Sequence, residues 1–182
     1  VGLVGIGAMG NVHYKAYKNV SDAKVIAVAD VRCEMAKERI GDDEVKLYTS
    51  MEEMMASEEL DMIDICLPSY MHAEASIKAL GMGYHVLCEK PSARTLSEAL
   101  EMQKAQHETG KVLNIGVVNR FNAAVNKVRE LIQAGELGEV YHIYVSFRAH
   151  RSIPGLGGAF TTKAIAGGGA LIDWGVHYLD IV

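Results

Sequence analysis

Predominantly apolar runs alternate with amphipathic stretches through the first two thirds of the chain. The apolar runs occupy residues 1–7, 24–30, 62–68, 84–91 and 111–118, with a weaker run at 45–50. Because both faces of these runs are apolar, they predict buried strands. Helices are expected between them, at residues 8–20, 33–40, 51–57, 72–81 and 97–109. Alternating strands and helices predict an α/β fold with a doubly wound parallel sheet of the Rossmann type.

The pattern changes after Asn119. A helical stretch at residues 123–135 precedes residues 139–150, where alternating apolar and polar positions predict a strand with one exposed face. Glycine and proline at 151–160 predict a loop, and a last helix is expected within 167–180. The chain begins inside a predicted strand, so we expect that a few residues precede Val1 in the whole protein.

The stretch "VGLVGIGAMG" matches a dinucleotide-binding fingerprint between a strand and a helix. Glycines allow a tight turn, a close approach of the backbone to a pyrophosphate and close packing of the helix, whose amino end stabilises negative charge. The predicted contacts of this loop are Gly5, Gly7, Ala8, Met9 and Gly10.

An acidic residue follows the next predicted strand at the spacing expected for a ribose contact. Asp30 ends "VAD" and would accept hydrogen bonds from the adenosine ribose, although a turn or helix-capping role is the alternative. Arg32 could stack on adenine, meet a 2′-phosphate or remain a solvated surface charge. The acid favours NAD over NADP, with NADP possible.

Two further groups of polar residues suggest chemistry. Lys90 in "CEKP" ends a strand where ligands bind such sheets, with Glu89 as its partner, although it could instead be an ordinary strand-end lysine. Asp173 and His177 are spaced i, i+4 and would share a helix face, as either a catalytic or a structural pair. The remaining histidines lack metal-ligand spacing, so no metal site is predicted and each is expected to be structural or exposed: His13, His72, His85, His107, His142 and His150.

Composition narrows the class of partner. The net charge is −5 with no basic cluster, which argues against nucleic acid and anionic membranes and favours a small molecule. No apolar run is long enough to span a bilayer, and the start does not resemble a signal peptide. The cysteines are odd in number and embedded in apolar runs, which predicts reduced core residues and a cytoplasmic protein: Cys33, Cys66 and Cys88.

The ordered motifs "GIGAMG", "VAD", "LPSYMH", "HVLCEKP", "NRF" and "GGGALIDWGVHYLD" resemble the Gfo/Idh/MocA family of NAD(P)-dependent sugar and polyol oxidoreductases. The resemblance covers essentially the whole chain. It implies a nucleotide-binding domain at 1–119 and, at 120–182, the start of an α+β open-sheet substrate domain. It also implies a catalytic lysine at Lys90, a helix aspartate at Asp173, and a proton-transferring histidine at His177. Cofactor contacts are further expected at Pro68, His72, Glu89 and Lys90.

Such an enzyme would transfer a hydride between a nicotinamide and a secondary alcohol or carbonyl of its substrate. A histidine suits removal of the hydroxyl proton, and a lysine suits stabilising the developing charge on oxygen. The alternatives are a glycosidase or lyase that uses NAD transiently, and a nucleotide-sensing protein without chemistry. Members continue well beyond the histidine-bearing helix, so we expect this chain to be truncated. We also expect a homodimer or homotetramer through the substrate-domain sheet.

Overall fold

The fold was analysed in a computed structural model that describes residues 1–148, 158 and 161–182. The chain divides into two compact units, Val1–Ile115 and Gly116–Val182, and each is described by itself.

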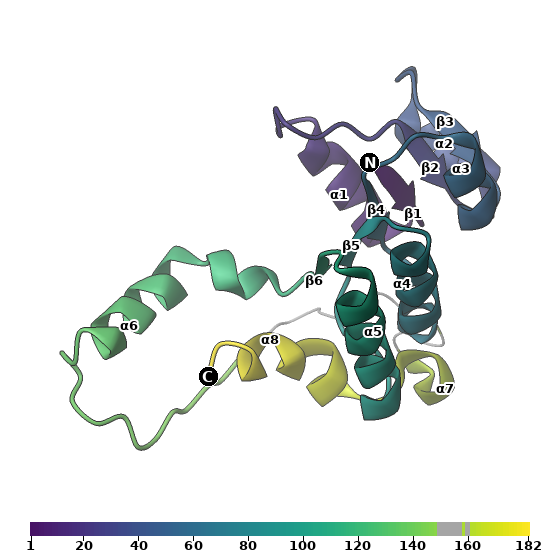
Figure 1. The fold of residues 1–182 in the computed structure, drawn as a ribbon. Coiled ribbons are helices and arrows are strands. Elements are labelled where there is room, and N and C mark those ends of the chain that lie inside the picture. Colours follow the sequence, from purple (N-terminus) through teal and green to yellow (C-terminus); the bar gives the residue numbers. More distant parts are fainter. Residues whose placement is uncertain (149–157, 159–160) are drawn as a thin grey trace. The chain divides into compact units, whose positions relative to one another are not determined.

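The first unit is built on a six-stranded sheet of order β3-β2-β1-β4-β5-β6 (Figure 1). Every pair of neighbours is parallel, and the central strand β1 pairs with both β2 and β4. This order is that of a dinucleotide-binding Rossmann sheet, with its crevice beside β1 and β4. The predicted sheet is therefore confirmed, including the weak strand β3. The strands are β1 (Gly2–Val4), β2 (Ala27–Ala29), β3 (Lys46–Tyr48), β4 (Met62–Ile65), β5 (His85–Cys88) and β6 (Leu113–Ile115).

Five α-helices connect these strands, close to the predicted positions. They are α1 (Ala8–Tyr17), α2 (Cys33–Ile40), α3 (Met51–Ser57), α4 (His72–Gly81) and α5 (Leu96–Thr109), with a short 3-10 turn η1 (Ser69–Met71) before α4. Hydroxyl side chains set two of the starts. Ser50 accepts the Glu53 N–H at 3.1 Å, and Thr95 forms a reciprocal capping box with Glu98. The first helix ends at Tyr17, three residues before the predicted end.

Alternating side chains of the sheet divide the core into two layers. Leu3, Ile6 and Val28 pack with Tyr14 of α1 and with α2, whereas Val4, Ala27, Ile63 and Ile65 pack with α3 and α4. Figure 1 shows α1 and α4 on opposite sides of the central strands. In β4 the residue between Ile63 and Ile65 must point to the α1 side. That residue is Asp64, whose contacts are described below.

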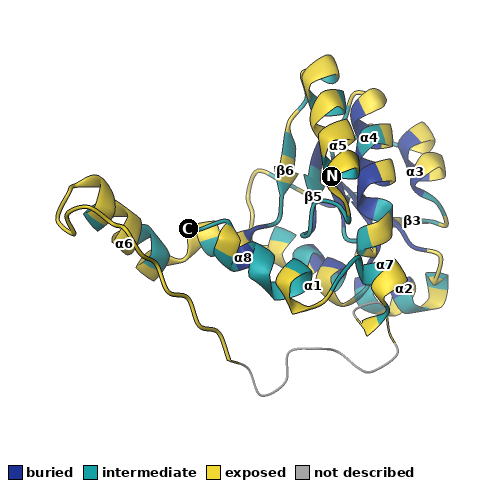
Figure 2. Ribbon diagram, turned by 90° about the horizontal axis from the view of Figure 1, so that it is seen from below, coloured by how far each residue is buried: buried dark blue, intermediate teal, exposed yellow. Residues whose placement is uncertain are grey.

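The second unit holds short helical elements. These are η2 (Val118–Phe121), α6 (Ala123–Gln133), α7 (Lys163–Ala166), the π-helical turn η4 (Leu171–Gly175) and α8 (Val176–Leu179). The predicted helix at 123–135 is confirmed as α6, which begins where the Asn122 side chain accepts the Ala124 and Val125 N–H groups. None of the residues of α6 is buried, and its ribbon is yellow and teal in Figure 2.

The strand predicted at residues 139–150 is wrong for its described part. Residues 140–148 form neither strand nor helix, and large apolar side chains along them are exposed, such as Tyr141 at 94% and Tyr144 at 79%. A strand needs a neighbour to accept its backbone hydrogen bonds, and none is present here among the described residues. Residues 149–150 and, apart from Gly158, the predicted loop at 151–160 lie outside the described part of the chain.

Candidate active site

The glycine loop joins β1 to α1, and each of its three glycines meets a different requirement. Gly5 has φ +83°, which is strained for other residues, and a Cβ at Gly10 would lie 1.9 Å from the Gly5 carbonyl oxygen. A Cβ on Gly7 would meet nothing nearer than Arg32 at 3.7 Å. The backbone is therefore open at Gly7, where α1 begins and no described side chain caps the helix. The first N–H groups of α1 can receive a phosphate there.

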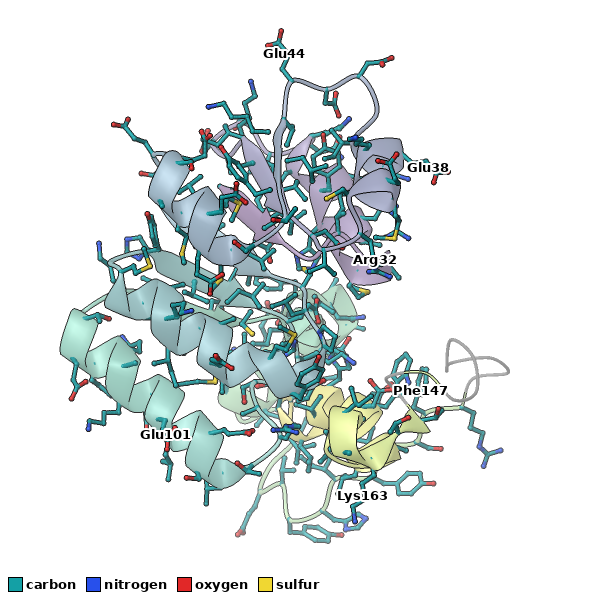
Figure 3. The ribbon with its side chains drawn as sticks, turned by 90° about the vertical axis from the view of Figure 1, so that its right-hand side faces the viewer. Arg32, Glu38, Glu44, Glu101, Phe147 and Lys163 are labelled. Atoms are coloured by element: carbon teal, nitrogen blue, oxygen red, sulfur yellow. The ribbon has the colours of Figure 1, made fainter. Side chains whose placement is uncertain are left out.

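Asp30 follows β2 and holds this loop in place. It is only 7% exposed, and its Oδ2 accepts the backbone N–H of Ile6 at 2.9 Å while its Oδ1 accepts that of Arg32 at 2.8 Å. Oδ2 has a second lone pair, so both the predicted ribose contact and the alternative turn role are compatible with this position. The Arg32 guanidinium lies 3.5 Å from Oδ1 through Nε and extends to the surface (Figure 3).

The loop after β4 is fixed by His72 and brings Pro68 to the same edge of the sheet. His72 is 1% exposed, and its ring nitrogens lie 2.7 Å from the Pro91 carbonyl oxygen and 2.8 Å from the Leu67 carbonyl oxygen. Both nitrogens are therefore occupied by backbone. The expected cofactor contact of His72 is at most indirect, and the imidazole ties the β4 loop to the segment that follows Lys90.

Glu89 and Lys90 extend β5 at the carboxyl edge of the sheet. The Glu89 N–H donates to the Ile65 carbonyl at 2.9 Å, so the β4 and β5 ends stay paired one residue beyond the strands. Glu89 is 6% exposed, and its Oε2 accepts the backbone N–H of Lys90 at 3.0 Å. The predicted partnership of these two residues is thus made through the Lys90 backbone. Lys90 itself is half-buried.

A histidine that the sequence analysis assigned to structure or surface lies within this group. His13 of α1 places Nδ1 2.9 Å from Asp64 Oδ2 and Nε2 3.0 Å from Glu89 Oε1. Asp64 is fully buried in β4, and the Cys66 sulfur lies 3.4 Å from Nδ1. We call His13, Asp64 and Glu89 the His13 network. A signal for it was present, because a buried aspartate in the apolar run "MIDIC" requires a partner.

The contacts within the His13 network shift the pKa values of its members. Hydrogen bonds that the ring makes with Asp64, Cys66 and Glu89 outweigh desolvation and raise the pKa of His13 to about 12. Burial acts to raise the pKa of Glu89, but the bond to the His13 imidazolium and its charge lower it below the ordinary value. Burial raises the pKa of the Cys66 thiol to about 12. The network therefore holds two carboxylates and one imidazolium, and each ring nitrogen donates to an acid.

This charge arrangement predicts a pH-dependent loss of stability in His13→Gln. A folded-state pKa above the ordinary value of 6.5 means that the contribution of His13 is complete below about pH 6.5 and declines as pH rises towards 12. Breaking a buried ion pair costs about 3–5 kcal/mol, so we expect a destabilisation of that order near pH 6. The measurement is the free energy of unfolding of both proteins by denaturant at pH 6 and pH 9.

Substitution at an exposed histidine is the control for this prediction. His107 lies exposed on α5, and His107→Gln should change the free energy of unfolding little at either pH. A difference between wild type and His13→Gln that stays constant from pH 6 to pH 9 would contradict the assignment of an imidazolium.

The second unit carries Asp173 and His177 on a helix that differs from the predicted one. Asp173 lies within the π-helical turn η4, and His177 is 8% exposed on α8. Single π-helical turns inserted in α-helices occur frequently at functional sites. The Trp174 ring lies 6.0 Å from the His177 ring and stacks at 4.5 Å on Phe147, which is labelled in Figure 3.

An ion pair in the second unit connects the motifs "NRF" and "GGGALIDWGVHYLD". Arg120 of "NRF" donates from Nε to Asp180 Oδ2 at 2.7 Å and from Nη2 to Asp180 Oδ1 at 2.5 Å. This bidentate pair ties η2 to the carboxyl end of α8 and so fixes the helix that bears His177. The hydrogen bond from Arg120 lowers the pKa of Asp180.

Each of the two units matches a domain of a known protein family. Residues 1–117 match the model of an oxidoreductase family with an NAD-binding Rossmann fold, and residues 125–182 match the GFO/IDH/MocA C-terminal domain. Among the described residues, no helix combines the length and apolar character needed to cross a membrane.

Individual relatives are similar over nearly the whole chain. The chain is 35% identical to D-glucoside 3-dehydrogenase of Escherichia coli over 99% of its length and 52% of that protein, and 25% identical to myo-inositol 2-dehydrogenase of Thermotoga maritima over 100% and 53%. An NAD-binding protein from Listeria innocua superposes with a TM-score of 0.87 at 30% identity, covering 99% of this chain and 52% of that one. The chain thus spans about half the length of these relatives, and it belongs to the Gfo/Idh/MocA oxidoreductase family.

Proposed function

We propose that the protein is an NAD-dependent oxidoreductase that transfers a hydride between the nicotinamide and a secondary alcohol or carbonyl of a sugar or cyclic polyol. The observation that carries this proposal is the joining of two features at one edge of the sheet. The glycine loop leads into α1, which carries His13. The Nε2 atom of His13 lies 3.0 Å from Oε1 of Glu89, the residue before Lys90. A lysine beside a dinucleotide loop suits a reaction at the nicotinamide. Relatives named as glucoside and inositol dehydrogenases support the substrate class.

The residues of the first unit fit a dinucleotide. The open backbone at Gly7, the uncapped start of α1 and the carboxylate of Asp30 lie along one loop, where they match a pyrophosphate and an adenosine ribose. Ala8 and Met9 are exposed in the first turn of α1, with their N–H groups directed to the same place. Pro68 would border the cofactor from the β4 loop. The bound cofactor would accept the hydride.

We assign the remaining steps to three side chains of this chain. Lys90 would hydrogen-bond the reacting oxygen and stabilise the negative charge that develops on it. His177 would take the proton of the hydroxyl, since histidine as a residue type exchanges protons near neutral pH. Asp173 would orient the imidazole or hold a neighbouring substrate hydroxyl. Lys90 belongs to the proposed nucleotide domain, residues 1–119, and Asp173 and His177 belong to the proposed substrate domain, which begins at residue 120.

The direct test is a panel of sugars and inositols, offered with NAD to the full-length protein. The proposed dehydrogenase accumulates reduced cofactor in step with oxidised product. A glycosidase or lyase that uses NAD transiently would form product without net reduction, and a sensing protein would bind NAD without turnover. Either of these two results would overturn the proposal.

Cofactor selection is expected to favour NAD. The Asp30 carboxylate can accept a hydrogen bond from a ribose 2′-hydroxyl but repels a 2′-phosphate, and Arg32 lies within 3.5 Å as a counterweight. We expect NAD to bind at least tenfold more tightly than NADP, a gap of about 1.4 kcal/mol. Fluorescence titration of both cofactors measures it.

Arg32→Ala is the informative variant for this prediction. Substitution of Asp30 would also release the Ile6 N–H and disturb the loop, whereas the Arg32 side chain is 62% exposed and can be removed alone. The variant should widen the preference for NAD by weakening NADP. Tighter binding of NADP than of NAD by wild type would show that Arg32 dominates over Asp30.

We further propose a cytoplasmic homo-oligomer. All three cysteines are unpaired with one another, which suits a reducing compartment. The exposed apolar side chains of residues 140–147 would be covered by further strands of a substrate-domain sheet, through which two or four subunits associate. Light scattering of the full-length protein would determine the number of subunits.

A further inference from the structure

Three elements of the nucleotide-binding unit meet at the His13 imidazole. The ring comes from α1, Asp64 from β4, and Glu89 from the end of β5. The side chain of His13 is 16% exposed, and those of Asp64 and Glu89 are 0% and 7% exposed. Hydrogen bonds between ionised groups shielded from water are stronger and more directional than surface pairs. The imidazole is therefore a rigid connection between the helix of the glycine loop and the strand end that carries Lys90.

Glu89 transmits this connection to Lys90. Its Oε1 faces His13 Nε2 at 3.0 Å, and its Oε2 accepts the Lys90 backbone N–H at 3.0 Å. The two carboxylate oxygens are thus used for two different elements. Loss of His13 would leave Glu89 as a buried carboxylate without its counter-ion, and the side chain would have to turn towards water. Such a rotation would release the Lys90 N–H.

The other end of the connection is also rigid. His13 lies one helical turn after Gly10, and the Gly10 Cα is so close to Gly5 that a Cβ would lie 1.9 Å from the Gly5 carbonyl oxygen. Helix α1 is therefore packed directly against the loop that binds the pyrophosphate. Burial and the Asp64 carboxylate also raise the pKa of Tyr17 of the same helix, which keeps this hydroxyl neutral. The His13 network thus bridges the cofactor loop and the strand end through fixed contacts.

We infer that the His13 network positions Lys90 relative to the cofactor loop, so that His13 and Glu89 are positioning residues for the proposed hydride transfer. This inference rests on the proposed function of Lys90 at the reacting oxygen. A displacement of about 1 Å at a reacting group can cost about a hundredfold in rate. Loss of the network should therefore lower kcat far more than it weakens cofactor binding.

The test compares two substitutions of Glu89 with a matched control in the full-length protein. Glu89→Ala removes both hydrogen bonds. Glu89→Gln can keep both once His13 Nε2 has lost its proton. The amide oxygen then accepts the Lys90 N–H, and the amide N–H₂ donates to the bare Nε2 while Nδ1–H still donates to Asp64. Tyr84→Phe is the control, since it deletes a 2.9 Å hydrogen bond to the Met55 carbonyl before the opposite end of β5. Each variant is measured for kcat, NAD affinity, thermal unfolding and hydrogen exchange at the Lys90 amide.

We expect Glu89→Ala and His13→Gln to lower kcat by about 10- to 100-fold, with NAD affinity changed only a few-fold and exchange at the Lys90 amide accelerated. Glu89→Gln should recover most of the loss, and Tyr84→Phe should lower stability without these effects. Unchanged exchange, unchanged kcat, or a loss of activity that Tyr84→Phe reproduces at equal stability would each overturn the inference. If wild type binds NAD but oxidises none of the substrates, the proposed function fails, and hydrogen exchange still shows whether the network holds Lys90.

Discussion

Replacing His177 by asparagine is expected to slow alcohol oxidation by about a hundredfold or more, because that is the usual contribution of a general base. The wild-type rate should rise with pH through one ionisation, and His177→Asn should remove this rise. The Asn side chain is polar and smaller than imidazole, so the buried position on α8 can accept it. NAD affinity should remain almost unchanged, since the cofactor contacts are proposed for the first unit. Steady-state kinetics across pH, with NAD titration, measures both quantities.

If the same helix has only a structural role, the variants are expected to behave differently. If Asp173 and His177 only stabilise the fold, their substitution should lower the melting temperature and reduce activity in proportion to unfolding. Asp173→Asn, measured beside His177→Asn, should give an intermediate rate if it orients the imidazole. A folded His177→Asn enzyme with full activity would end the catalytic interpretation of this helix.

Much of the nucleotide-binding unit could be predicted because local patterns determine it. Both faces of the strands are covered by helices, so the strands appear as apolar runs, and Gly5, Gly7 and Gly10 mark the turn into α1. Helix starts at Ser50 and Thr95 follow from their hydroxyl caps. Right-handed crossovers account for helices on both faces of a parallel sheet, whereas the order of the strands is seen only in the structure.

Long-range pairing was harder to predict. His13 and Asp64 are 51 residues apart, and His13 and Glu89 are 76 residues apart, so nothing in the local pattern joins them. The aspartate within the apolar run of β4 is a sign that a partner is needed, but the sequence does not identify that partner. The same limit applies to Arg120 and Asp180, which are 60 residues apart.

The second unit departs from its pattern for a physical reason. Alternation at residues 139–150 is compatible with a strand, but a strand forms only where another strand accepts its hydrogen bonds. The π-helical turn η4 was also missed, because i, i+4 spacing of Asp173 and His177 fits both kinds of helix approximately. Trp174 within this turn stacks on Phe147 at 4.5 Å, a contact that is not visible in the spacing.

Lys90→Met and Lys90→Arg are both expected to lower turnover by about a hundredfold to a thousandfold, the size of a lost hydrogen-bond donor to a developing oxyanion. Methionine removes the charge at similar length. Arginine keeps the charge, but its planar fork places the donors at different points from a compact ammonium, so it should not restore the rate. Because the predicted interaction exists mainly in the transition state, kcat should fall while NAD affinity stays within a few-fold.

A lysine on an exposed helix face is the matched control for Lys90. The side chain of Lys104 on α5 is 74% exposed and pairs only loosely with Glu108 at 3.7 Å, so Lys104→Met should leave kcat and stability close to wild type. Thermal unfolding of the Lys90 variants separates a loss of stability from a loss of turnover, and the backbone contact of residue 90 with Glu89 is available in both variants. Near-normal turnover in either Lys90 variant would show that the lysine is an ordinary charge at the end of β5, and the transition-state role would pass to other donors at this edge of the sheet.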